Sequence, residues 1–286
     1  MKCLIVLFIV ITPLINLKAQ FISEIKSAVS FIYVEDSLGN KVANGTCFFV
    51  SIKSKEDTSN YYPYLVTAKH VLQDVNGEFY KAVFVRMNTV DSSRFTYVPI
   101  ITDSPEKRVY FHSDSTVDIA VIPYVPPKDD YLFKSLEPGY LIDKPTFKNL
   151  PIEEGTETFF TGLFTPYAGN KRIHPIVRFG RISLITDEKI DWVGMKREMM
   201  LLETSSFGGN SGSPVYFKVP LSNGLYKIIL GGVLNGTYRD YAEIKVIETS
   251  VDFMPIALYN NGISGITPVY LLRDILYSNE LEKLRI

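Results

Sequence analysis

Short apolar segments alternate with turn-forming residues along most of the chain. In the first half, such segments rich in Val, Ile, Phe, Tyr and Thr lie at 29–35, 42–52, 64–68, 81–86, 95–100 and 119–123. Runs of this length and composition are typical of β-strands. A second series follows at 157–162, 174–185, 199–204, 214–219, 226–234 and 243–249. The pattern predicts two all-β halves with about six strands each.

Two segments depart from this strand pattern. Residues 126–151 contain several prolines and charged residues with little periodicity, which is typical of a linker between domains. After Pro268, helical spacing is carried by Leu271, Leu272, Ile275 and Leu276. We therefore expect an N-terminal β unit at 20–125, a linker at 126–151, a C-terminal β unit at 152–267 and a helix at 268–284.

The first residues have the features of a secretory signal peptide. Lys2 precedes an apolar stretch at 3–17, and Ala19 offers a small residue for cleavage. The alternative is an uncleaved N-terminal membrane anchor, although the stretch is shorter than the roughly 20 apolar residues of a spanning helix. We predict a secreted or periplasmic protein from which residues 1–19 are removed. Cys47 is then the sole cysteine, so no intramolecular disulfide is expected.

Composition and charge exclude several classes of protein. A chain of 286 residues with 46% apolar and 21% charged side chains is globular, neither disordered nor fibrous. The formal net charge is −1, and no long run of like charges is present. Because nucleic-acid binding needs a basic surface, nucleic acid is not expected as a partner. The sequence leaves the oligomeric state open.

The sharpest chemical signal is the segment Phe207–Pro214, which reads FGGNSGSP. Glycine occurs where a chain turns sharply or where another group must approach closely. A substrate carbonyl could therefore reach the Ser211 hydroxyl while the N–H groups of Gly209 and Ser211 face the oxygen that becomes negative. The alternative is an ordinary turn between two strands.

A serine nucleophile needs a neighbouring base, and histidine has a suitable proton affinity. Of the three histidines, His70 ends a strand-like segment, whereas His112 and His174 are better explained as surface or structural residues. Asp118 begins an apolar strand, where a buried carboxylate would need a partner such as an imidazole N–H. Asp114 is a rival candidate, and an exposed aspartate at a strand start is the alternative for Asp118.

The order His70, Asp118, Ser211 is that of chymotrypsin-like proteases and excludes the serine-acid-histidine order of α/β-hydrolases. The segments TAKH at 67–70, DIAVI at 118–122 and GNSGSP at 209–214 resemble the three signatures of trypsin-like serine peptidases. The likeness is greatest to the bacterial branch with HtrA (Do-like) proteases and glutamyl endopeptidases. It covers about residues 25–280. The resemblance implies an all-β chymotrypsin-like fold, with two six-stranded antiparallel β-barrels and a short C-terminal helix.

The resemblance also implies a function. A serine endopeptidase would cut protein or peptide substrates through an acyl-enzyme, with Ser211 attacking, His70 transferring the proton and Asp118 orienting His70. The N–H groups of Gly209 and Ser211 would form the oxyanion hole. No metal or cofactor is implied. Two alternatives remain: a catalytically silent binding module on the same fold, and an anchored envelope protein with a scaffold role.

Specificity is implied by the same resemblance. Ser205 would form the floor of the primary specificity pocket, and Leu234, Asn235 and Gly236 would form one wall. No carboxylate stands at the floor, so burying the charge of a substrate Arg or Lys would be costly. Leu234 also replaces the histidine that reads a substrate carboxylate in glutamyl enzymes. We therefore expect a preference for neutral side chains.

Two further features depart from relatives of this kind. Asn210 stands where animal trypsins have the aspartate that pairs with a newly freed N-terminus, so we expect no proteolytic activation. No residue run follows the predicted helix for a PDZ module, so we expect none of the substrate-capturing apparatus of HtrA proteins.

Overall fold

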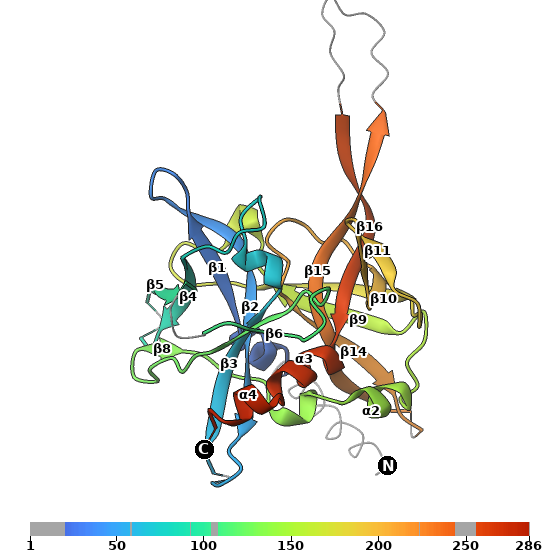
Figure 1. Ribbon diagram of the computed structural model, residues 1–286, viewed down its shortest axis with the longest axis horizontal. Coiled ribbons are helices and arrows are strands. Elements are labelled where there is room, and N and C mark those ends of the chain that lie inside the picture. The colour runs from blue at the N-terminus through green and yellow to red at the C-terminus, as the bar shows by residue number, and fades with distance from the viewer. Residues whose placement is uncertain are drawn as a thin grey trace, which may run out of the picture.

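The computed structural model describes residues 21–57, 59–91, 93–103, 108–222, 224–243 and 256–285, excluding the side chains of 239–243 and 256–259. Figure 1 shows two β-rich parts side by side, with the N-terminal strands on the left and the C-terminal strands on the right. The predicted signal peptide, and the predicted strand at 243–249 beyond its first residue, lie outside the described residues. None of the described helices is long and apolar enough to cross a membrane.

The N-terminal part is an antiparallel sheet of eight strands. They are β1 (Val29–Glu35), β2 (Lys41–Lys53), β3 (Tyr61–Thr67), β4 (Ala82–Thr89), β5 (Phe95–Ile101), β6 (Tyr110–Phe111), β7 (Ala120–Pro123) and β8 (Tyr131–Leu132). The order is β5-β4-β1-β2-β3-β7-β6, and β8 pairs with β4. In the β3–β7 ladder, Thr67 lies opposite Ala120. Because the strands are antiparallel, the residues that follow β3 lie beside those that precede β7.

The C-terminal part is a closed barrel with the order β10-β13-β16-β15-β14-β9. Its strands are β9 (Glu157–Gly162), β10 (Ile176–Leu184), β13 (Met200–Glu203), β14 (Pro214–Pro220), β15 (Tyr226–Glu243) and β16 (Ile256–Pro268). Two short strands, β11 (Ile190–Trp192) and β12 (Met195–Arg197), form a separate hairpin between β10 and β13. Past the barrel, β15 and β16 continue as a projecting two-stranded ribbon (Figure 1).

The helical segments are short. Residues 21–27 are helical, and further along lie η1 (Lys69–Leu72), η2 (Pro138–Tyr140), α2 (Lys144–Lys148), η3 (Thr165–Tyr167), α3 (Val269–Leu276) and α4 (Asn279–Glu282). The helix predicted at 268–284 is therefore two helices. The second begins where the Ser278 side chain accepts a hydrogen bond from the Leu281 N–H, which caps a new helix N-terminus.

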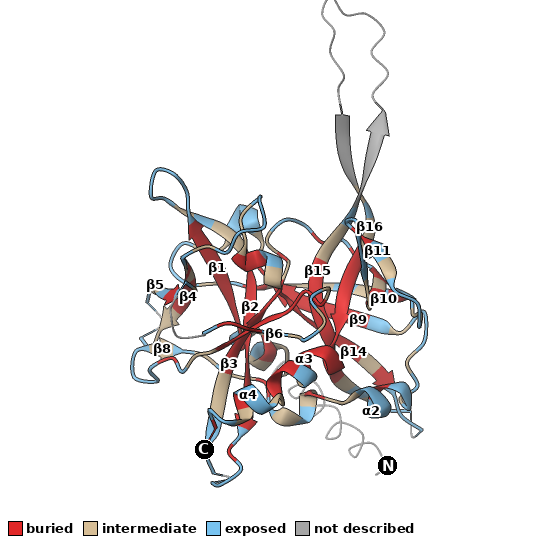
Figure 2. Cartoon of the chain, in the orientation of Figure 1, coloured by how far each residue is buried: buried red, intermediate tan, exposed pale blue. Residues whose placement is uncertain are grey.

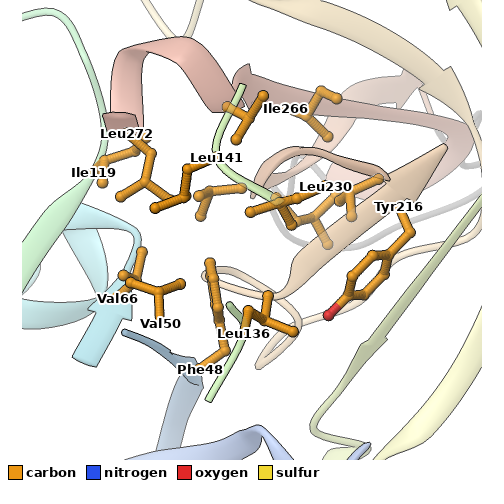
Figure 3. Close-up of a cluster of buried hydrophobic side chains, with 14 of the residues drawn as sticks. Phe48, Val50, Val66, Ile119, Leu136, Leu141, Tyr216, Leu230, Ile266 and Leu272 are labelled. Atoms are coloured by element: carbon orange, nitrogen blue, oxygen red, sulfur yellow. The ribbon is translucent and has the colours of Figure 1, made fainter. Parts of the chain in front are cut away.

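One hydrophobic core joins the two parts. Figure 3 shows its side chains, including Phe48, Val50 and Val66 from the N-terminal sheet, Leu230 and Ile266 from the barrel, Leu272 from α3, and Leu136 and Leu141. The last two belong to the segment predicted as a linker, so that segment packs into the molecule. Figure 2 shows buried residues running continuously through the junction. A second cluster within the N-terminal sheet contains the free, buried Cys47.

The predicted all-β class is confirmed: the molecule is mostly β, with a closed six-stranded antiparallel barrel, a second sheet and a C-terminal helix. The described residues form one closed barrel where two were expected, because the N-terminal strands make an eight-stranded sheet whose order runs from β5 to β6 without closing. Two further details differ from the expectation. The N-terminal sheet also contains β6 and β8, strands of only two residues that were not predicted. The barrel is completed by β16, which was not predicted because the glycines and asparagines at 260–265 are typical of a turn.

Candidate active site

His70 and Asp118 meet where β3 ends and β7 begins. His70 Nδ1 lies 2.7 Å from Asp118 Oδ2, and the His70 backbone N–H donates to Asp118 Oδ1 at 3.0 Å. The Asp118 side chain is 3% exposed, whereas that of His70 is 45% exposed. A buried carboxylate thus fixes a half-exposed imidazole through Nδ1, so Nε2 is the ring nitrogen that can exchange a proton with a reacting group.

Asp118 carries two further partners on the same oxygen. Arg197 Nη1 and Asn235 Nδ2 each lie 3.0 Å from Asp118 Oδ2. Burial alone would raise the pKa of Asp118, but His70, Arg197 and the Asn235 amide together hold it well below its usual range. Asp118 is therefore a carboxylate at neutral pH.

The rival acid, Asp114, has other partners. Lys189 Nζ lies 2.8 Å from Asp114 Oδ2, and the Thr116 hydroxyl donates to Asp114 Oδ1 at 2.7 Å. The hydrogen bond from Lys189, followed by those from Thr116, lowers the pKa of Asp114. The structure thus brings Asp118 to His70 and turns Asp114 to the β11–β12 hairpin.

Ser211 lies in the loop between β13 and β14, against the middle of β2. Its backbone carbonyl accepts a hydrogen bond from the Thr46 N–H at 2.8 Å. Its Oγ donates to the carbonyl oxygen of Asn235 at 3.0 Å, and within the described residues no hydrogen bond joins Ser211 to His70. Asn235 thus touches both Ser211 and Asp118. Proton transfer from Ser211 to His70 would require the hydroxyl to rotate away from the Asn235 carbonyl.

Gly212 explains why the loop of the predicted nucleophile, Ser211, can lie so close to the N-terminal sheet. Its φ of +86° is in the left-handed region that favours glycine. A Cβ at Gly212 would lie 2.1 Å from the Thr46 carbonyl oxygen and 2.4 Å from Thr67 Oγ1. The missing side chain therefore lets Ser211 sit beside the end of β3, from which η1 and His70 follow.

The predicted oxyanion loop is held by Asn210. This buried side chain accepts from the Phe207 N–H at 2.8 Å through Oδ1 and donates from Nδ2 to the Leu163 carbonyl. Gly209 adopts a φ of +90°. In the part of the chain that the structure describes, the N–H groups of Gly209 and Ser211 donate to no protein acceptor. Both are therefore available to a ligand oxygen.

The residues predicted to wall the specificity pocket have separate roles. Leu234 is fully buried in the shared core, so its side chain cannot touch a substrate and only its backbone can border a pocket. The Asn235 side chain is also buried, with Nδ2 on Asp118 and Oδ1 accepting from the Thr267 hydroxyl at 2.9 Å. Gly236 is the one beside the predicted nucleophile, since a Cβ there would lie 3.6 Å from Ser211 Oγ.

Ser205, the predicted floor residue, is exposed and lines a cavity of about 1410 Å³ on the barrel. The cavity is mostly apolar, with Phe21, Phe159, Phe179, Leu225 and Tyr226 in its lining. Glu203 and Arg181 also line it, so charged groups of both signs stand at this surface.

His112 and His174 have structural contacts, and the described residues form no evident metal site. His112 Nδ1 accepts from the Asp114 N–H at 2.9 Å, and the His174 ring stacks on Tyr167. Among the described residues, no three or more His, Cys, Asp and Glu side chains lie close enough together to hold a metal ion.

Sequence reasoning missed Arg197. It is a single arginine at the end of a three-residue strand, and nothing in its local sequence distinguishes it from a solvated charge. Only the tertiary packing of the β11–β12 hairpin brings it to Asp118.

The chain resembles known proteins in structure and not in sequence. No protein-family model and no curated protein matches the chain. The chain is similar to the crystal structure of the MamO protease domain from Magnetospirillum magneticum in its apo form, at 12% sequence identity and a TM-score of 0.49. The match covers 89% of this chain and 98% of that one.

Proposed function

We propose that this protein is a serine endopeptidase that hydrolyses peptide bonds in protein or peptide substrates. The observation that supports it best is the contact of 2.7 Å between buried Asp118 and half-exposed His70, at the junction where the Ser211 loop lies. A buried acid that orients an accessible imidazole is what a general base requires.

In the proposed reaction, Ser211 Oγ leaves the Asn235 carbonyl, gives its proton to His70 Nε2 and attacks the scissile carbonyl carbon. The carbonyl oxygen becomes negative and accepts hydrogen bonds from the N–H groups of Gly209 and Ser211. His70 then gives the proton to the leaving amine, and the acyl group stays on Ser211. A water molecule, deprotonated by His70, hydrolyses this ester and restores the free enzyme.

One observation favours the competing function, a catalytically silent binding module on the same fold. The Ser211 hydroxyl donates to Asn235 and not to His70. A serine that stayed in this position would have no base.

Labelling with a fluorophosphonate separates the two functions. We expect the unmodified protein to be labelled on Ser211, and Ser211→Ala to lose labelling and at least ~10³-fold in turnover. Ser213→Ala is the matched control, because this buried serine lies in the same loop and should keep both properties. An unlabelled but folded wild type would favour the silent module, and labelling that persists in Ser211→Ala would overturn the assignment.

We also propose a preference for neutral side chains before the cut bond and a location outside the cytoplasm. Profiling on a peptide library should give kcat/KM at least ~10-fold higher for Leu, Val, Met or Phe than for charged residues. A higher kcat/KM for Arg, Lys or Glu than for the neutral residues would contradict this preference. Fractionation of cells distinguishes a secreted or periplasmic protein from an N-terminally anchored one.

A further inference from the structure

The β11–β12 hairpin is held by two ion pairs against the acid segment, the stretch from Asp114 to Asp118 that leads into β7. Lys189, just before β11, lies 2.8 Å from Asp114, and Arg197, the last residue of β12, lies 3.0 Å from Asp118. Both aspartates belong to the short stretch that leads into β7. The hairpin is therefore held at both of its ends against the segment that carries the proposed acid.

Arg197 is not an ordinary surface cation. Its side chain is 13% exposed, and its Nε is buried with no hydrogen-bond partner among the described residues. The hairpin is also anchored by buried Trp192, whose ring lies 5.9 Å from that of Tyr238. Burying a guanidinium is costly unless its charge is compensated, and Asp118 supplies that compensation.

The position of Arg197 has a chemical consequence because Asp118 Oδ2 is shared. The same oxygen lies 2.7 Å from His70 Nδ1 and 3.0 Å from Arg197 Nη1. A carboxylate stabilises a protonated imidazole, whereas a fixed cation on that carboxylate opposes the second positive charge. Arg197 and protonated His70 therefore compete for one negative charge.

The other charged side chains near the His70–Asp118 pair have partners other than Asp118. From η1, Lys69 donates to the Ser115 carbonyl at 2.8 Å, and from the acid segment and the hairpin, Asp114 and Lys189 pair with each other. The groups that face the dyad from β15 and the nucleophile loop, Asn235 and Ser211, are uncharged. Arg197 is thus the cation in direct contact with the carboxylate that orients His70.

We propose that Arg197 is a positioning residue that holds Asp118 in place and keeps the His70 imidazole neutral to lower pH than the His70–Asp118 pair alone would. Its consequence for catalysis rests on the proposed peptidase function. The protonation of His70 can be measured whether or not the protein is a peptidase.

The test is an NMR titration of the full protein with ¹³C-labelled histidine, in which His70→Gln identifies the His70 signal among three. In Arg197→Gln, we expect the midpoint of the His70 titration to move to higher pH by about half a unit or more. Arg197→Lys keeps a charge and should stay closer to the wild type. Lys189→Gln is the matched control, because it breaks the ion pair at the other end of the hairpin without touching Asp118.

Activity gives a second readout. If the peptidase function holds, the acid limb of the kcat/KM profile should shift to higher pH in Arg197→Gln and stay in place in Lys189→Gln. An inactive wild type would contradict the proposed function and leave the NMR test intact.

Several results would overturn the role of Arg197. An unchanged midpoint in folded Arg197→Gln would do so, and so would an equal shift in Lys189→Gln. Should Arg197→Gln fail to fold, Arg197→Met keeps much of the aliphatic stem and gives the same readout. Both neutral variants could fail to fold. In that case the His70 titration of Arg197→Lys is repeated at high salt, which weakens its ion pair, and an unchanged midpoint there would assign Arg197 a purely structural role.

Discussion

The two halves of the candidate site are held in different ways. The His70–Asp118 pair is positioned by the β3–β7 ladder, in which Thr67 and Ala120 are opposite partners. Ser211 lies on a loop and is positioned by its neighbours: Gly212 allows close contact with β2 and β3, and Asn210 ties the chain to Leu163. The proposed base and acid therefore depend on a repeated backbone pattern, whereas the proposed nucleophile depends on a few individual residues.

This difference indicates which part of the site is more sensitive to substitution. A strand ladder tolerates many side chains, because backbone groups make its hydrogen bonds. A loop with a left-handed glycine and a buried amide tolerates few. Substitutions in the nucleophile loop should therefore have larger effects than substitutions of similar size along β3 or β7.

The largest effect is expected for Gly212→Ala. The new methyl group would overlap the Thr46 carbonyl and Thr67 Oγ1, at a φ that alanine rarely adopts. We expect a loss of about 3 kcal/mol or more in the free energy of unfolding, together with loss of fluorophosphonate labelling. Gly208→Ala is the control, because no atom lies within 4 Å of a Cβ there. Denaturant unfolding of both variants makes the comparison, and equal losses would contradict it.

A smaller effect is expected for Asn210→Ala. The substitution leaves the buried Leu163 carbonyl and the Phe207 N–H without their side-chain partner. We expect a loss of about 1–3 kcal/mol of stability, and a larger decrease in kcat than in 1/KM because the oxyanion loop is loosened. Asn210→Asp should not rescue the variant, since a carboxylate cannot donate to Leu163. Full activity in Asn210→Ala would show that Gly209 alone sets the loop.

Asn210 also bears on activation. An amide that already bonds within the protein does not need a freed N-terminus, so a few residues added before Gln20 should leave activity largely intact. A mature protein that stays inert until its N-terminus is trimmed would refute this.

The stability that the segment of Asp114 contributes should depend on pH. The nucleophile loop is held by the uncharged Asn210 amide, so its contribution should not. The pKa of Asp114 is lowered in the folded state, chiefly by Lys189, so its ionised form stabilises the protein above the unfolded value of about 4. This contribution is lost as pH falls through the lowered folded value. The stability gap between wild type and Asp114→Asn should thus be constant above about pH 5 and shrink below about pH 4. Denaturant unfolding from pH 3 to 7 measures the gap, and one that widened on acidification would have the wrong sign.

The smallest effect is expected for Ser213→Ala, two residues from the nucleophile. Ser213 Oγ is buried and has no hydrogen-bond partner in the part of the chain that the structure describes. Removing an unpaired hydroxyl costs no hydrogen bond, so stability should stay within about 1 kcal/mol of the wild type or rise slightly. A loss of several kcal/mol, measured by denaturant unfolding, would mean that the hydroxyl has a partner such as an ordered water.

The sequence predicted the parts of the site that local patterns mark. Ser211 lies among glycines, His70 ends a strand and Asp118 begins one, so each could be found from its neighbours. Arg197 could not, because its contact with Asp118 joins residues 79 positions apart through an irregular hairpin. The contact of the Asn235 side chain with Asp118 could not be predicted either, because it also joins residues that are far apart in the sequence.

Most strands were also predictable, since alternating β-branched and aromatic residues mark them. The exceptions are the short strands β6, β8, β11 and β12 and, among the longer strands, β16, whose ribbon half contains Asn260, Asn261 and Gly262, residues that favour turns. Its pairing with β15 overrides that local preference. The break between α3 and α4 was missed because the apolar periodicity ends there without a proline or glycine to mark it.

The shared core has a consequence for how the molecule is made. The helices that follow the barrel pack back onto the N-terminal sheet: Leu272 lies beside Ile119 in Figure 3, and Lys55 pairs with Glu282 at 2.9 Å. On the ribosome, the N-terminal sheet is synthesised long before these helices emerge. The packing of this sheet can therefore be completed only after the helices emerge, when nearly all of the described chain has been made. Incomplete chains would lack this part of the shared core.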